Sequence, residues 1–464
     1  MTYTEPKTIR ELIDFAAAEY GTKPAYAEQE GEQTKYYSFI DVKNTVDGIA
    51  GHLINMGLTG RHIAVMGVNS FARTAAYYAV LCVGTVVPLP AEAPLSSIDF
   101  MLKASDAALI LTDTETEYAC PRLPLNPDGE AAAGFPVSKP EDLAQIVFTS
   151  GTTGTPKGVM LSQKNIMSIA NCEFHPWAGI IGISVLPQYH AFESMCHLLV
   201  LLRNGRLLFM CPSLRRFAPM VASSGCDTLY LVPALAEALI TRMRPYLDKA
   251  TKLKRIVCGG ASVPQSLVDA YAELGIDVMT GYGLSECSPL VSLNHRLLKN
   301  CCGVIGKYCR VRISDEGEIQ VKGENVMSGY YKNEAATRAA FTEDGWLKTG
   351  DLGELDENNN LFLKGRIKNL IILSNGENVS PEELEALIVN SVKGAADALV
   401  SAKNDRLHAL IYIPGGAGDE ALSAAKDEIA KMNSGIESFK RINGVTLTAE
   451  PLPVNALGKK IRSL

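Results

Sequence analysis

An apolar segment, AQIVFTS at residues 144–150, runs directly into the loop TSGTTGTPKG at residues 149–158. The loop combines glycines, hydroxyl side chains and one lysine, which suits a site for anionic phosphate. It fails the Walker A pattern, because Lys157 is followed by Gly158 instead of Ser or Thr. A solvated linker is the alternative, but linkers rarely follow a buried strand so directly. The sequence therefore predicts an α/β sheet with a phosphate site at the carboxyl end of a strand.

Other segments of the first 300 residues also alternate between strand and helix patterns. A strand at 62–68, a helix at 71–84 and a strand at 108–111 predict a parallel α/β layer. Before them, residues 8–19 have helical apolar spacing, with Thr8 as N-cap and Glu11 as its capping-box partner. Proline-rich residues 121–140 are predicted to be a surface connection. Further strand–helix units are predicted near 207, near 228 and from 255 onward.

The pattern changes beyond about residue 310. Residues 311–323 and 353–365 alternate and contain Asp, Gly and Asn turns, which predicts antiparallel hairpins. A last segment with mixed α and β patterns follows Arg366, and Ser380 with Glu383 predicts a helix start there. We expect a large domain of layered α/β sheets with a small antiparallel subdomain at 1–366. A smaller, mobile α+β domain is expected at 367–464, with the hinge near 366–368.

Composition limits the classes of function. The net charge of −7 argues against nonspecific nucleic-acid binding. The N-terminal residues lack an apolar signal core, and no apolar run is long enough to span a bilayer, so a cytoplasmic protein without a transmembrane segment is expected. The eleven cysteines contain no CxxC pair and are predicted to be reduced, buried thiols.

Two later motifs contain candidate ligand-binding side chains. In MTGYGLSECSP, residues 279–289, Tyr282 offers a flat face for a nucleobase and Glu286 an oxygen ligand for Mg²⁺. In the stretch from 346 to 371, Asp351 and Arg366 are an acceptor and a donor suited to two ribose hydroxyls. Spacing alone leaves open an ordinary surface ion pair between them.

With NALGKK at residues 455–460, these motifs resemble those of the adenylate-forming superfamily. That superfamily includes acyl-CoA synthetases, adenylation domains of nonribosomal peptide synthetases and firefly luciferases. TSGTTGTPKG resembles its phosphate loop, YGLSE its adenine and magnesium motif, GWLKTGD its ribose motif, and GRIK its hinge. The resemblance implies that a carboxylate attacks the α-phosphate of ATP·Mg²⁺, releasing pyrophosphate. A thiol then displaces AMP from the acyl-adenylate after the small domain rotates.

The resemblance also implies roles for individual residues. Ser285 would contact the α-phosphate, Glu286 would bind Mg²⁺, and Lys459 would bridge the α-phosphate and the substrate carboxylate. Because Lys460 follows Lys459 directly, the alternative that Lys460 takes this role instead stays open. The implied ATP- and AMP-binding residues are Thr149, Ser150, Gly151, Thr152, Thr153, Gly154, Lys157, Gly260, Ala261, Gly281, Tyr282, Gly283, Asp351, Arg366 and Lys459. Lys368 would be the hinge residue, and Gly376 would approach the pantetheine of coenzyme A.

The acid and the thiol are less closely defined by the motifs. The acid pocket is expected to include His190, Phe192, Gly259 and Thr280. His190 occupies the place of an Asp in amino-acid-activating relatives, and LPQYHAFESM resembles fatty-acyl-CoA synthetases. This favours a fatty or other hydrophobic acid, with His190 either a buried structural residue or a gate. The chain ends at Leu464 without a carrier segment, so the thiol is expected from coenzyme A. The alternative is the phosphopantetheine of a separate carrier protein. A monomer or homodimer is expected.

Overall fold

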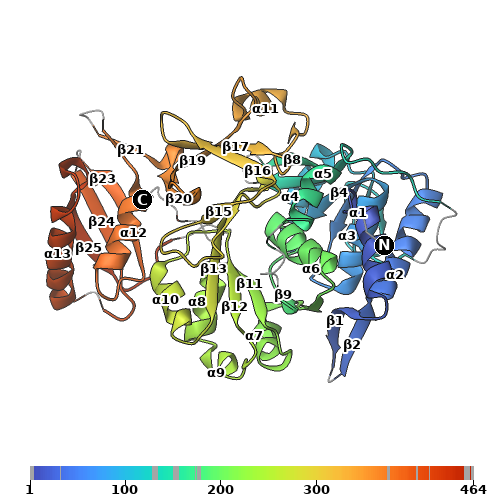
Figure 1. Cartoon of the computed structure of the whole chain (residues 1–464), viewed down its shortest axis with the longest axis horizontal. Coiled ribbons are helices and arrows are strands. Elements are labelled where there is room, and N and C mark those ends of the chain that lie inside the picture. Colours follow the sequence, from blue (N-terminus) through green and yellow to red (C-terminus); the bar gives the residue numbers. More distant parts are fainter. Residues whose placement is uncertain are drawn as a thin grey trace.

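The computed structural model describes residues 5–31, 33–127, 134–149, 156–172, 174, 179–373, 377–403, 406–416, 418–453 and 460. Figure 1 shows α1 to α3 at one end of the molecule and the C-terminal strands and helices at the other. The helices are α1 (Ile9–Tyr20), α2 (Phe39–Asn55), α3 (Phe71–Val83), α4 (Leu95–Ala104), α5 (Gln163–Ala170), α6 (Val200–Arg203), α7 (Leu214–Ser223), α8 (Pro233–Thr241), α9 (Arg244–Leu247), α10 (Gln265–Ala272), α11 (Glu334–Ala340), α12 (Pro381–Ser391) and α13 (Asp419–Ser434).

A seven-stranded sheet contains the strand that leads into the phosphate loop. Its order is β18 (Gly329–Tyr330), β8 (Lys157–Ser162), β7 (Leu143–Thr149), β4 (Thr85–Leu89), β3 (His62–Met66), β5 (Leu109–Leu111) and β6 (Arg122–Leu123). The pair of β3 with β5 is parallel, as predicted, and β3 also pairs parallel with β4, a strand that the sequence patterns did not predict. Residues 121–140 were expected only at the surface, which is wrong for 122–125. Strand β6 extends the sheet, and Leu125 is buried in the main core.

A nine-stranded sheet joins the later strand–helix units to the antiparallel hairpins. Its order is β11 (Thr228–Leu231), β12 (Arg255–Cys258), β13 (Asp277–Tyr282), β14 (Ser292–Leu293), β15 (Gly303–Ile305), β20 (Asn360–Arg366), β19 (Leu347–Leu355), β17 (Glu318–Gly323) and β16 (Cys309–Ile313). Strand β13 pairs parallel with β12 up to Thr280 and antiparallel with β14 from Gly281. The predicted hairpins therefore continue the α/β sheet, and Tyr282 belongs to the strand and not to a turn after it.

Two smaller sheets are also present. One lies in the part of the chain before residue 366, and the other lies at the start of the C-terminal segment. The first has the order β2 (Gln33–Ser38), β1 (Pro24–Glu30), β10 (Leu207–Met210) and β9 (Ile181–Ser184). Strand β10 was predicted near residue 207. The second pairs β21 (Ile371–Ile372) with β22 (Asn378–Val379) just after the segment predicted as the hinge.

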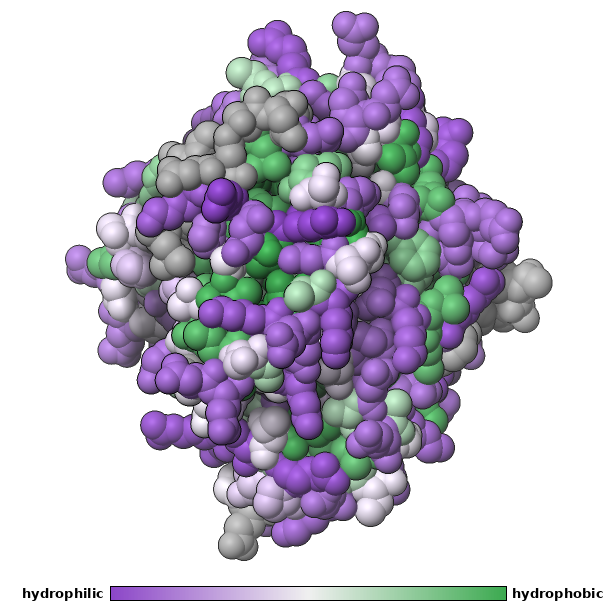
Figure 2. All heavy atoms as spheres, turned by 90° about the vertical axis from the view of Figure 1, so that its left-hand side faces the viewer, coloured by the Kyte–Doolittle hydropathy of each residue, from purple (hydrophilic) through white to green (hydrophobic). Residues whose placement is uncertain are grey.

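The C-terminal segment has its own apolar core. Helices α12 and α13 pack on the sheet β23 (Asp397–Lys403), β24 (Arg406–Tyr412) and β25 (Ile442–Thr448). Leu384, Ile388, Val400, Ile411 and Ile429 are buried there in one cluster. Figure 2 shows the outer face of this segment, where polar side chains cover most of the coloured surface and apolar ones occur in small groups. A separate core supports the proposal of a second domain after residue 366.

The predicted helix caps are present, although the capping boxes are not. Thr8 accepts a hydrogen bond from the backbone N–H of Glu11 at 3.3 Å, and Ser380 accepts one from Glu383 at 3.4 Å. The carboxylate of Glu11 accepts from the N–H of Lys7 at 2.7 Å instead of closing the box. These caps stabilise each helix start by about 1 kcal/mol.

Nine of the eleven cysteines are buried, as predicted, while Cys120 and Cys302 are half-buried. All eleven are free thiols, and none of them is exposed. Burial raises the pKa of Cys258 and of Cys302 to about 12, so these thiols stay protonated at neutral pH. Among the helices that the structure describes, none combines the length and apolar character needed to cross a bilayer.

Candidate active site

The flanks of the phosphate loop are two antiparallel strands. Strand β7 ends at Thr149 and β8 begins at Lys157, and these two residues face each other in the ladder. The predicted ligands Ser150, Gly151, Thr152, Thr153 and Gly154 lie outside the described residues. A Walker A loop connects a strand to a helix, whereas this loop connects a strand to a strand. The loop therefore differs from a Walker A loop both in its sequence and in the elements that it connects.

Tyr330 connects the end of the phosphate loop to the predicted magnesium ligand. The ring of Tyr330 lies 5.1 Å from the Nζ atom of Lys157, within the range of a cation–π contact. Its hydroxyl donates to Oε1 of Glu286 at 2.9 Å. Burial and the carboxylate raise the pKa of Tyr330, which keeps this hydroxyl protonated as a donor. This role could not be predicted from the sequence, because Tyr330 reaches the site through the pairing of β18 with β8.

Glu286 has the character of a single-carboxylate ligand for Mg²⁺. It lies with Ser285 in a 3-10 turn at Ser285–Cys287, directly after β13, and both residues are half-buried. The carbonyl of Glu286 accepts from the N–H of Met327, which fixes the turn. Oε1 accepts the hydrogen bond from Tyr330, which leaves Oε2 as the oxygen for an ion. One or two carboxylates together with substrate phosphates are the usual Mg²⁺ environment. These residues therefore fit the metal.

The glycines around Tyr282 are required by close packing. A Cβ atom on Gly283 would lie 1.6 Å from the carbonyl oxygen of Pro289, although Gly283 itself is exposed. A Cβ atom on Gly281 would lie 3.0 Å from the carbonyl oxygen of Ser292. The backbone between β13 and Pro289 thus folds back on itself, and this places Ser285 and Glu286 beside the end of β13.

Tyr282, Asp351 and Arg366 form one hydrogen-bonded group. Nε of Arg366 lies 2.5 Å from Oδ1 of Asp351, and the hydroxyl of Tyr282 donates to Oδ2 at 2.8 Å. Asp351 and Arg366 are direct partners in the ladder of β19 with β20, so the predicted pair is present. Asp351 is 4% exposed, which makes it a buried carboxylate rather than part of a surface ion pair. Burial and Asp351 raise the pKa of Tyr282.

Gly260 and Ala261 lie just beyond the end of β12, the strand that pairs with β13. Both are exposed. Gly260 has a φ of +84°, a conformation that favours glycine. The structure therefore brings Tyr282, Asp351 and Arg366 together from β13, β19 and β20, and it places Gly260 and Ala261 after the neighbouring β12.

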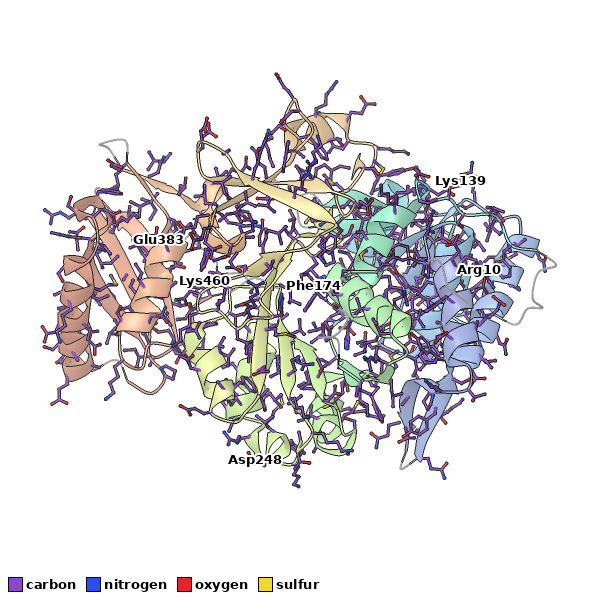
Figure 3. All side chains as sticks on the ribbon, in the orientation of Figure 1. Arg10, Lys139, Phe174, Asp248, Glu383 and Lys460 are labelled. Carbon is purple, nitrogen blue, oxygen red and sulfur yellow. The ribbon has the colours of Figure 1, made fainter. Side chains whose placement is uncertain are left out.

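A small apolar cavity of about 30 Å³ is lined by residues of β11, β12 and β14 of the nine-stranded sheet and by α5. Among the described residues that line it, none carries a charged side chain; they include Phe174, Phe192, Cys196, Tyr230 and Leu293. Figure 3 labels Phe174 in the interior of the molecule, between the two large sheets. The volume of the cavity is that of about one water molecule, so the side chains that line it must move before a larger ligand can bind there.

The four predicted acid-pocket residues are placed differently around this cavity. Phe192 lines it, and Gly259 lies behind Phe192, since a Cβ there would be 3.5 Å from the ring. The hydroxyl of Thr280 donates to the carbonyl of Cys301 at 2.9 Å. His190 is exposed, with its ring 4.3 Å from that of Tyr189. The alternative of a buried structural histidine is therefore wrong, because the turn before Phe192 carries His190 outward.

A buried Glu–His pair supports one wall of the cavity, and the sequence reasoning missed it. Glu193 and His197 are fully buried in a π-helical segment, Phe192–Leu199, with Nδ1 3.0 Å from Oε1. The ring of His197 stacks on Tyr230 at 4.1 Å, and Tyr230 lines the cavity. The spacing of four residues between the two was a signal that could have indicated the pair. π-Helical turns are frequent at functional sites.

The residues predicted for the mobile part are only partly described. Lys368 is exposed in a 3-10 turn, Ile367–Asn369, between β20 and β21. Gly376 and Lys459 lie outside the described residues. Lys460 is described, and its Nζ atom lies 2.6 Å from Asp397 and 3.1 Å from Glu385. Lys368 therefore has no hydrogen bond or ion pair with those nucleotide residues that the structure describes, and Lys460 has other partners.

Comparisons with known proteins agree with these features. The model of a family described as AMP-binding enzyme matches residues 13–331. The 2-succinylbenzoate–CoA ligase of Bacillus cereus is 27% identical over 92% of this chain and 92% of its own length. The long-chain-fatty-acid–CoA ligase of Thermus thermophilus is 27% identical over 86% of this chain and 84% of its own length.

The fold is shared with a solved structure. That of o-succinylbenzoate coenzyme A synthetase from Bacillus subtilis, in complex with ATP and magnesium ion, has a TM-score of 0.80. It is 23% identical and covers 97% of this chain and 98% of that one. This likeness confirms the predicted fold class, an α/β fold with a large N-terminal and a smaller C-terminal part.

Proposed function

The chain belongs to the AMP-binding enzyme family, and we propose that it activates a hydrophobic carboxylic acid with ATP and transfers the acyl group to coenzyme A. It is an AMP-forming acid–thiol ligase that uses ATP, Mg²⁺ and coenzyme A. The observation that carries the proposal is the hydrogen-bonded group on β13, β19 and β20 of the nine-stranded sheet. Tyr282, Asp351 and Arg366 are hydrogen-bonded there, directly next to the turn of Glu286.

The proposed roles follow the chemistry of each side chain. The buried carboxylate of Asp351 accepts from ribose hydroxyls, and Arg366 both holds that carboxylate and donates to the sugar. Tyr282 lies against the base. The hydroxyl of Ser285 donates to the α-phosphate, while Lys157 and the residues from Thr149 to Gly154 hold the phosphates that leave as pyrophosphate.

Catalysis in this site needs charge neutralisation more than proton transfer. A carboxylate is already deprotonated at neutral pH, so no general base is required. Mg²⁺, when bound, would supply neutralisation of the charge that develops on the phosphate oxygens. Glu286 would hold the ion, and Tyr330 would fix the orientation of that carboxylate. Lys459, outside the described residues, is proposed to bridge the acid and the α-phosphate.

The apolar cavity supports a hydrophobic acid as substrate. Because no charged side chain is among its described lining residues, a second charged group on the acid would be costly to bury there. The names of the relatives include acids with and without a second charged group. One relative is named for 2-succinylbenzoate and one for long-chain fatty acids. We propose a fatty or other hydrophobic monocarboxylic acid, with coenzyme A as acceptor. A separate carrier protein is the alternative acceptor.

A pyrophosphate-exchange screen tests the proposal. Wild-type enzyme with ATP and Mg²⁺ is incubated with straight-chain fatty acids, aryl acids, dicarboxylic acids and amino acids. Exchange with hydrophobic monocarboxylic acids is expected, and AMP should form fully only after coenzyme A is added. Exchange with dicarboxylic or amino acids alone contradicts the proposed substrate class. Thioester formed on phosphopantetheinylated carrier proteins but not on coenzyme A contradicts the proposed acceptor.

The Tyr330→Phe variant tests the Mg²⁺ role of Glu286. It removes the hydroxyl that donates to Glu286 and keeps the ring beside Lys157. Loss of such a supporting hydrogen bond is expected to weaken the apparent Mg²⁺ affinity about tenfold. The affinity is measured from exchange rates at varied Mg²⁺ and from calorimetric titration of Mg²⁺ into the ATP complex.

The neighbouring residue provides the control for this variant. The hydroxyl of Tyr331 donates to Asp106 at 2.7 Å, and within the described part of the chain it makes no hydrogen bond to Glu286. Tyr331→Phe should leave the Mg²⁺ affinity within about twofold of wild type. Equal Mg²⁺ affinities for the two variants would exclude the positioning role of Tyr330.

A further inference from the structure

The ammonium group of Lys460 is saturated by acceptors from the C-terminal core. Its Nζ atom lies 3.1 Å from Oε2 of Glu385, 2.6 Å from Oδ1 of Asp397 and 2.7 Å from the carbonyl oxygen of Ala398. A lysine has three N–H donors, so all three are used. Figure 3 labels Lys460 beside α12, on the side that faces the rest of the chain.

The acceptors of Lys460 join two elements of that core. Glu385 belongs to α12 and is 4% exposed, and its Oε1 accepts from the N–H of Val400 in β23 at 2.9 Å. Asp397 and Ala398 begin β23. Lys460 therefore attaches the C-terminal tail to the junction of α12 and β23. Because a buried carboxylate is costly without a cation, Glu385 favours a lysine at this position.

Lys460 is covalently next to Lys459, the proposed catalytic lysine. Consecutive Cα atoms lie 3.8 Å apart, so an anchor at Lys460 restricts the possible positions of Lys459 to a short radius. The two lysines of the doublet then have different functions. Lys460 is engaged within the C-terminal core and does not have a donor left for a phosphate, which favours the register with Lys459 in the site.

We propose that Lys460 is a positioning residue, which anchors the tail to α12 and β23 so that Lys459 is presented to the nucleotide in the adenylation step. This inference rests on the proposed function. Misplacement of a reacting group by about 1 Å is enough to lower a rate substantially, roughly tenfold or more. Because Lys459 would act only when the acyl-adenylate forms, loss of the anchor should affect that half-reaction selectively.

Lys460→Met tests the anchor, because methionine keeps an unbranched side chain and removes all three hydrogen bonds. Adenylation, measured by pyrophosphate exchange, is expected to fall roughly tenfold. Thioester formation from a chemically prepared acyl-adenylate should stay within about twofold of wild type. Hydrogen exchange of tail residues 452–464 should become faster, and this readout does not depend on activity.

Two further variants make the result unambiguous. Lys440→Met removes contacts to Glu383 and Glu437 at 3.4 and 3.5 Å, also on the C-terminal core, and should leave both half-reactions unchanged. Asp397→Asn removes one charge from the anchor and should show the same selective loss to a smaller extent. It also serves if Lys460→Met does not fold.

The outcomes separate this inference from the proposed function. Absence of wild-type exchange with every acid rejects the proposed function, while faster tail exchange in Lys460→Met would still report the anchor. Equal losses in both half-reactions, or a freed tail with unchanged adenylation, would overturn the positioning role. A loss confined to adenylation supports it.

Discussion

Replacing Asp351 by alanine is expected to lower kcat/KM for ATP about 100-fold. Hydrogen bonds to a charged group contribute about 1.5–3 kcal/mol each, and a carboxylate placed between two ribose hydroxyls makes two of them. A loss of about 3 kcal/mol corresponds to about two orders of magnitude in rate. Asp351 is the acceptor that holds both Tyr282 and Arg366, so the change also releases these two side chains.

For Asp351→Ala, the decrease in the free energy of unfolding should be smaller than the loss of transition-state stabilisation for the reaction with ATP. The side chain of Arg366 is 36% exposed, so water screens the charge that loses its partner. The hydroxyl of Tyr282 loses its acceptor in a buried position, which costs about 1–2 kcal/mol. Urea denaturation with and without ATP distinguishes a damaged site from an unfolded protein.

Two comparisons complete the Asp351 experiment. Asp351→Asn keeps an acceptor for Tyr282 but removes the charge, so an intermediate loss is expected. Asp344 forms a bidentate pair with Arg312 at 2.6 and 2.9 Å on the surface, and Asp344→Ala should change neither kcat nor KM. If Asp351→Ala retains wild-type kcat/KM for ATP, Asp351 does not bind the ribose.

The Asp351–Arg366 pair was predictable because it is local to one hairpin. Turn residues between two alternating runs fixed the antiparallel pairing of β19 with β20, and this pairing places the two residues opposite each other. The helix caps at Thr8 and Ser380 were predictable for the same reason. In each case, the residues that interact are close in sequence and belong to a known local pattern.

Other contacts depend on tertiary packing and could not be predicted. Tyr330 meets Glu286 because β18 joins the edge of β8, whose residues lie about 170 positions earlier in the chain. The change of β13 from parallel to antiparallel pairing depends on the presence of β14, which propensity does not encode. The contacts of Lys460 require the folded C-terminal core. The sequence thus predicted candidate reacting groups, but not the residues that the structure places in contact with them.

Gly283→Ala is expected to lower the free energy of unfolding by about 3 kcal/mol and to abolish nucleotide binding. The new Cβ would lie 1.6 Å from the carbonyl oxygen of Pro289, and a backbone atom cannot move aside as a flexible side chain can. Overpacking usually costs about 1–3 kcal/mol, and this collision is with backbone. Exposure alone would have suggested a tolerant position, since Gly283 itself faces solvent.

The loss of binding follows from what the collision displaces. Either the segment around Pro289 or the end of β13 must shift, and the turn that carries Ser285 and Glu286 lies between them. Calorimetric titration with ATP·Mg²⁺ and urea denaturation measure the two effects. Gly134→Ala is the matched control, because nothing lies within 4 Å of its Cβ position. Wild-type stability and ATP affinity in Gly283→Ala would mean that the turn tolerates displacement. Glu286 would then not need the close backbone packing that we assign to this glycine.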